Sequence, residues 1–123
     1  MPILLAAVAA ACIANVHDGD TVRLCDGERV RLEGIDAPEL TGSPRCSAQS
    51  RVRLKASANP AWCDAAAGLA SRDGLRAFLA SGPALIRRTG TDRYGRTLAT
   101  LSVNGRDAGQ YLIARGLAHP WRK

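Results

Sequence analysis

Three short runs of β-forming residues, separated by turns that contain Asp-Gly, constrain the fold of this chain most strongly. The runs are residues 12–16, 21–25 and 29–35, and the turns lie at residues 17–19 and 26–27. Apolar and polar residues alternate within the second and third runs, as in strands that bury one face. The segment therefore predicts a three-stranded meander.

The second turn constrains the register of that meander. A two-residue loop would mix apolar and charged side chains on one face of the hairpin. A three-residue loop at residues 26–28 instead sets Leu24 opposite Val30, which keeps the apolar residues together. The arginines of both strands then share the other face, which is a candidate functional surface.

The register of the first hairpin stays open at this point. One register pairs Cys12 with Cys25, and a different one best aligns Val16 with Val22. The alternation of side chains does not choose between them.

The middle of the chain changes character. Residues 40–62 are rich in Ser, Arg, Pro and Asn without a clear period, which predicts a long and often functional loop. Asp64 then provides an N-cap for a helix over residues 65–80, and Gly82-Pro83 ends it. One apolar side of this helix is expected to pack on the sheet.

The last third repeats the pattern of strands followed by a helix. Strands are expected at residues 84–89 and 97–103, around a charged loop at 90–96, and a second helix at 107–115 that Gly116 caps. Five short strands in a three-plus-two arrangement, with these two helices, outline an α+β fold that is mainly β. We therefore expect a five-stranded OB-fold barrel with two packed helices.

The net charge points to the class of partner. The 123 residues suffice for one domain and carry 17 Lys and Arg against 11 Asp and Glu, a net charge of +6 with a pI near 9.8. Arg, which dominates the excess, binds phosphate with a fork of two donors. A polyanion is favoured, although excess charge also serves solubility or attraction to anionic membranes.

The first residues and the cysteines bear on the compartment. Residues 3–11 are apolar and end in an Ala-rich pattern before Cys12, which resembles the end of a secretory signal. The run is too short to span a membrane, and an apolar first strand is the other interpretation. We expect domain boundaries of 1–11 for this segment and 12–123 for the globular domain.

Four cysteines suit two disulfides in an oxidising compartment. Cys12 and Cys25 flank the first hairpin, and Cys46 and Cys63 flank the polar stretch, so this pairing is predicted from three possible connectivities. A secreted or periplasmic protein is expected, or a cytoplasmic one if the four thiols are reduced.

Three clusters combine carboxylates and arginines: residues 18–21, Arg31 with residues 36–39, and residues 92–96. Carboxylate oxygens are ligands for calcium or magnesium, and guanidinium groups fork onto phosphate. Each cluster taken alone is also compatible with ordinary turns and strand ends. Their residue types are consistent with a site for phosphodiester hydrolysis, which needs positive charge near the phosphate and a group that activates water.

The sequence HDGDTVRLCDGERVRLEGIDAPE at residues 17–39 resembles the first motif of the staphylococcal nuclease family. The sequence TDRYGRTLATLSVNGRDAGQYLIARGLA at residues 91–118 resembles its second motif, and the resemblance spans about residues 13–121. It implies a calcium-dependent nuclease that cleaves DNA and RNA with little sequence preference and leaves 3'-phosphates. The alternative is a non-catalytic nucleic-acid-binding module on the same fold. In either case a monomer is expected.

The resemblance also assigns roles to residues of this chain. It implies that calcium is held by the side chains of Asp20 and Asp36 and by the main-chain carbonyl of Ala37. It makes Glu39 the candidate general base. Arg31 and Arg96 would stabilise the phosphate, and Arg93, Tyr94 and Trp121 are the candidate substrate-binding residues.

Overall fold

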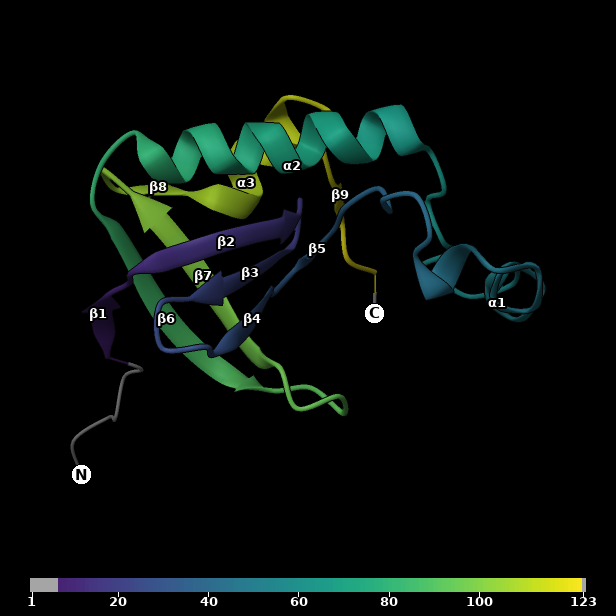
Figure 1. The fold of residues 1–123 in the computed structure, drawn as a ribbon, viewed down its shortest axis with the longest axis horizontal. Coiled ribbons are helices and arrows are strands. Elements are labelled where there is room, and N and C mark those ends of the chain that lie inside the picture. Colours follow the sequence, from purple (N-terminus) through teal and green to yellow (C-terminus); the bar gives the residue numbers. More distant parts are fainter. Residues whose placement is uncertain (1–6, 123) are drawn as a thin grey trace.

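The computed structural model describes residues 7–122, which form a seven-stranded sheet, a small second sheet and three α-helices (Figure 1). The large sheet has the order β1-β6-β7-β4-β3-β2, with β8 paired to β7. All of its pairs are antiparallel except β4 with β7. Its strands are β1 (Val8–Ala10), β2 (Ile13–Asp18), β3 (Thr21–Leu24), β4 (Arg29–Leu32), β6 (Ala84–Thr91), β7 (Thr97–Val103) and β8 (Arg106–Asp107).

The five strands expected from the sequence are β2, β3, β4, β6 and β7, so the mixed fold class is confirmed. The arrangement is consistent with an OB-like fold. The second sheet pairs β5 (Ile35–Asp36) with β9 (His119–Pro120), which brings the C-terminal segment beside the end of the meander. This pairing matters for the site described below.

The core lies between the large sheet and two of the helices, α2 (Ala65–Ala80) and α3 (Ala108–Ala114). Figure 1 shows α2 running along one side of the sheet with α3 next to it. Alternate residues of the central strands point into this layer, as the period of two requires. Its largest fully buried aliphatic side chains are Val22, Val30, Ile35, Leu75, Ile86, Leu101, Val103 and Leu112.

Both predicted helices are present, because their start signals are local. The Asp64 carboxylate accepts a hydrogen bond from the Ala67 amide at 3.0 Å, and Asp107 likewise caps α3. Such caps satisfy amides at the helix N-terminus that have no partner within the helix. Gly116 adopts a φ of 71° just after α3, the conformation expected of a C-terminal glycine.

The predicted register of the second hairpin is wrong by two positions along β4. Leu24 lies opposite Glu28, not Val30, and its amide donates to the Glu28 carbonyl at 2.9 Å. The loop consists of residues 25–27, and Gly27 closes it with a φ of 94°. A shift of two residues leaves every side chain on the same face, so the alternation of apolar residues does not detect it.

The first hairpin satisfies both competing registers through β-bulges. Ile13 pairs with Leu24, the same register that joins Cys12 to Cys25. After a register shift, Val16 pairs with Val22. The extra residue of the bulge absorbs the one-residue difference between the two alignments.

Residues 40–62 are not a long loop throughout, which corrects the expectation from the sequence. They contain the 3-10 helix η1 (Pro44–Cys46) and helix α1 (Ala48–Leu54). Ser47 caps α1 by accepting from the Ser50 amide at 3.1 Å. No residue of α1 is buried, and a helix without a buried face shows no apolar period.

The disulfide pairing expected from the sequence is confirmed. Cys12 bonds to Cys25 and Cys46 bonds to Cys63, with Cα atoms 5.4 and 5.8 Å apart. Residues 8–10 of the apolar segment form β1 and pair with β6. The first six residues of the predicted signal segment lie outside the described residues, and its removal stays a prediction. Between residues 7 and 122, no helix is long and apolar enough to cross a membrane.

Candidate active site

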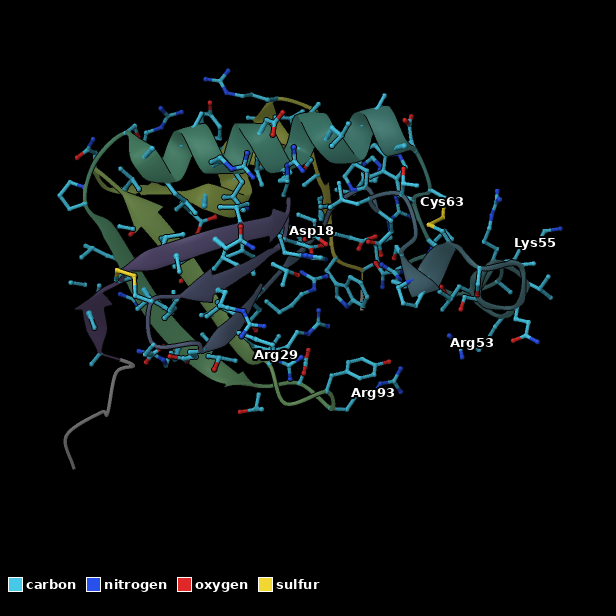
Figure 2. The ribbon with its side chains drawn as sticks, in the orientation of Figure 1. Asp18, Arg29, Arg53, Lys55, Cys63 and Arg93 are labelled. Carbon is cyan, nitrogen blue, oxygen red and sulfur yellow. A yellow bond between two sulfur atoms is a disulfide. The ribbon has the colours of Figure 1, made fainter. Side chains whose placement is uncertain are left out.

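Carboxylates from three segments lie close together at the end of the meander, and Figure 2 labels one of them, Asp18. Asp18 and Asp20 lie at the β2–β3 turn, Asp36 ends β5, and Glu39 follows it. All three aspartates are buried and Glu39 is partly buried. The Asp20 carboxylate accepts from the Ala37 amide at 2.9 Å, and this bond ties the turn to the segment that follows β5.

Arg31 on β4 lies between two of these carboxylates. Its Nη2 is 3.4 Å from Oδ2 of Asp20 and 3.8 Å from Oδ1 of Asp36. The guanidinium also faces the ring of Trp121 at 5.6 Å from the ring centroid. One cation thus offsets part of the negative charge of the cluster.

Arg45 of η1 is a member of the cluster that sequence reasoning missed. Its Nη1 donates to Oδ1 of Asp36 at 3.0 Å and to Oε1 of Glu39 at 3.2 Å. Burial alone would lower the pKa of Arg45, but Asp36 and Glu39 raise it, which keeps the guanidinium charged. The one signal in the sequence was that Arg45 directly precedes Cys46, because the disulfide from Cys46 to Cys63 holds this segment in place.

The acids are crowded enough that their protonation is perturbed. Burial, followed by the charge of Asp20, raises the pKa of Asp18 to about 8. Burial is also the main cause that raises the pKa values of Asp36 and Glu39, with neighbouring carboxylates adding to it. Apart from Asp18, the cluster has three carboxyl groups, of Asp20, Asp36 and Glu39, against the two guanidinium groups of Arg31 and Arg45, so a further cation would stabilise their charged forms.

The second charged cluster forms the turn between β6 and β7. Asp92 accepts from the amides of Tyr94 and Arg96 at 2.9 Å, and its Oδ2 lies 2.7 Å from Nε of Arg96. Leu98 pairs with Arg31 across β7 and β4, and Arg96 lies in the turn directly before β7, two residues from Leu98. Arg93 and Tyr94 are exposed at the tip of this turn (Figure 2).

The structure thus brings some of the predicted site residues into contact and leaves others apart. Asp20, Asp36, Arg31 and the Ala37 amide are in direct contact, and Glu39 joins them through Arg45. Arg96 is paired with Asp92 instead. Within residues 7–122, no three His, Cys, Asp or Glu side chains already converge as a metal-binding group.

Helix α2 positions Glu39 through a close approach at Gly68. A Cβ atom on Gly68 would lie 2.6 Å from the main-chain oxygen of Glu39. We expect Gly68→Ala to lower the free energy of unfolding by roughly 1–3 kcal/mol, although alanine favours helices. Gly74→Ala is the matched control, because its one close contact would be with the movable end of the Leu117 side chain, and its contact with Leu112 at 3.7 Å is an ordinary one. Urea unfolding of both variants checks this, and equal stabilities would contradict it.

The raised pKa of Asp18 predicts how stability depends on pH. The folded protein holds a proton on Asp18 up to a pH of about 8, and the unfolded chain loses it near pH 4. Asp18 therefore destabilises the fold progressively as the pH rises between these values. In the presence of a chelator, Asp18→Asn should be more stable than the parent at pH 8 by on the order of 5 kcal/mol, because each unit of pKa shift corresponds to about 1.4 kcal/mol.

The difference should disappear toward pH 4, because both side chains are then neutral. Asp26→Asn, at an exposed turn position, provides the control. Urea unfolding across this pH range is the measurement. A constant difference between Asp18→Asn and the parent protein would contradict the assignment.

Comparison with known proteins identifies a family model and a relative that match this chain. The family model described as staphylococcal nuclease homologue matches residues 29–122. A curated relative, the succinoglycan biosynthesis protein ExoI of Rhizobium meliloti (strain 1021), is 37% identical over 107 residues. The aligned region covers 85% of this chain and 49% of that protein, so the chain matches about half the length of this relative.

Proposed function

The chain belongs to the staphylococcal nuclease homologues, and on this premise we propose that it is a calcium-dependent phosphodiesterase. Its substrates would be DNA and RNA, cleaved with little sequence preference to leave 3'-phosphates. One observation carries the proposal: Asp20, Asp36 and Glu39 lie in one cluster with Arg31. This combination supplies oxygen ligands, a base and a phosphate-binding cation.

The donor set of the cluster suits calcium, which binds hard oxygen ligands. The side chains of Asp20 and Asp36 and the carbonyl of Ala37 would hold it. Burial and mutual repulsion already raise the pKa of Asp36, and a divalent cation would relieve that repulsion. When bound, calcium would polarise a phosphate oxygen and offset the charge that develops there.

Glu39 is proposed as the general base. Its raised pKa, caused mainly by burial, brings its proton affinity closer to neutral pH, where a base is most effective. Water attacking the phosphorus would give its proton to the Glu39 carboxylate, the bond from phosphorus to the 5'-oxygen would break, and that oxygen would leave as a hydroxyl after taking up a proton. Arg45 binds Oε1 of Glu39, so Oε2 would be the oxygen that accepts the proton.

The arginines would stabilise the phosphate as it gains charge. Arg31 lies within the cluster, and Arg96 lies directly before β7, whose Leu98 pairs with Arg31. Guanidinium donors aimed at developing negative charge are a large contribution to catalysis. Three exposed residues would bind the rest of the nucleic-acid strand: Arg93, Tyr94 and Trp121. Their aromatic rings are available for base stacking.

The two disulfides support an exported protein, secreted or periplasmic, because such bonds persist in oxidising compartments. We propose a monomer with residues 12–123 as the catalytic domain, and an export signal that ends before β1, because Val8–Ala10 pair with β6. The net charge of +6 would attract the polyanionic substrate.

A second candidate is a nucleic-acid-binding module without hydrolysis. The contact that favours it is Arg45, whose guanidinium occupies one oxygen each of Asp36 and Glu39. If the guanidinium stays there, Glu39 is less basic and calcium has fewer free ligands.

One assay separates the two candidates. Purified protein is incubated with single-stranded DNA and with RNA, first with calcium and then with a chelator. Calcium-dependent cleavage supports the phosphodiesterase. If the folded protein binds DNA but does not cleave it under either condition, the result supports the binding module.

A further inference from the structure

A cleft of about 470 Å3 opens beside the carboxylate cluster. Its walls are Asp36, residues 58–62, and His119, Pro120 and Arg122 of the C-terminal segment. The cleft therefore shares Asp36 with the proposed calcium site, but most of its lining comes from other segments. Neither Trp62 nor His119 has a role in the proposed hydrolysis.

The two aromatic residues of the cleft are stacked. The rings of Trp62 and His119 lie 4.0 Å apart between centroids and are tilted by 17°. Trp62 is partly buried and His119 is exposed, so the pair presents ring surface at the edge of the cleft. Such surface binds flat aromatic rings, and every nucleobase has a face that can stack on it.

The walls of the cleft are held in place by polar contacts. Asn59 exchanges two hydrogen bonds with the main chain of Arg122, at 2.6 and 2.8 Å. Arg45 donates to the Asn59 carbonyl at 3.0 Å, and the disulfide to Cys63 closes the same segment. A cleft held in this way loses little conformational entropy when a ligand binds.

The charge of the segment that forms the cleft favours a polyanion. Residues 40–63 contain four Arg or Lys and no Asp or Glu. Arg53 and Lys55, at and just after the end of α1, project away from the core in Figure 2. Arg122 lines the cleft itself. An uncharged oligosaccharide would stack on the same rings but would not need this positive charge.

We propose that this cleft binds one nucleobase of a single-stranded nucleic acid, next to the phosphate held at the carboxylate cluster. The base would stack on the outer face of the exposed His119 ring and so extend its stack with Trp62, and Arg122 would contact a neighbouring phosphate. The inference rests on the proposed function, because the shared wall at Asp36 sets the distance between base and phosphate.

The experiment measures binding without hydrolysis. Trp121→Phe leaves Trp62 as the single tryptophan, and its fluorescence is followed during titration with a thymidine tetranucleotide in chelator. Four further tetranucleotides each lack one base. Loss of one particular base should weaken binding about tenfold and abolish quenching of Trp62, whereas loss of the others changes the affinity much less.

Variants give a second readout. In the same background, His119→Ala should weaken binding of the complete tetranucleotide by roughly tenfold, and it should erase the effect of the missing base. The matched control is His17→Ala, which removes an exposed histidine on β2 and should bind like the parent.

The possible outcomes separate the cleft from the hydrolysis. Calcium-dependent cleavage with equal binding of all five tetranucleotides would overturn the base site and leave the phosphodiesterase standing. Base-dependent quenching without any cleavage would support the site and count against hydrolysis. Quenching by an uncharged oligosaccharide but not by the tetranucleotide would also overturn the proposal.

Discussion

Glu39→Gln is expected to reduce calcium-dependent cleavage of single-stranded DNA by roughly 10²- to 10⁴-fold. The amide has the shape of the carboxylate and still accepts the hydrogen bond that Arg45 donates to Oε1. It does not accept a proton from water, so the variant removes the proposed base and little else. Initial rates at saturating substrate measure the effect.

The fold should survive this substitution. The main-chain amide of Glu39 donates to the Trp62 carbonyl at 2.8 Å, and that bond does not involve the side chain. Removing a partly buried carboxylate whose pKa is raised should leave stability unchanged or higher. Glu33→Gln, at an exposed position after β4, is the matched control and should cleave at the parental rate. Full activity in Glu39→Gln would exclude Glu39 as the base.

Much of the fold could be predicted because its signals are local. Asp64 and Asp107 cap the two main helices, and their side chains bond to amides only three residues ahead. The register of the second hairpin could not be predicted, since a shift of two residues keeps the same faces buried. Helix α1 was missed because it has no buried side chain and hence no period.

The site was predicted in the same uneven way. Asp20 and Asp36 lie in motifs that resemble a known family, so their grouping was expected before the structure. Asp18 was placed in a turn and in the first charged cluster but was given no role of its own, although it is buried and its pKa is raised to about 8. The contacts of Arg45 and the Trp62–His119 stack depend on how residues 40–63 fold back toward the carboxylate cluster. No pattern of neighbouring residues in the sequence predicts these long-range contacts.

The second large effect is expected from Arg96→Ala. Removing the guanidinium should reduce turnover by roughly 10²- to 10³-fold, because a donor aimed at the developing phosphate charge is lost. The turn around it should persist, since the amides of Tyr94 and Arg96 still donate to Asp92. Arg96→Lys should recover only part of the loss, because lysine keeps the charge without the fork of donors.

The control must remove the same charge and the same kind of pair elsewhere. Arg88 on β6 meets this condition, because it is bound to the Glu28 carboxylate at 2.6 Å as Arg96 is bound to Asp92 at 2.7 Å. If Arg88→Ala lowers kcat as much as Arg96→Ala does, the loss reflects net charge and Arg96 has no specific contact with the phosphate. If Arg88→Ala raises only KM, in a salt-dependent way, then Arg96 acts on the transition state. Arg88 in that case contributes only to the electrostatic attraction of the nucleic-acid substrate.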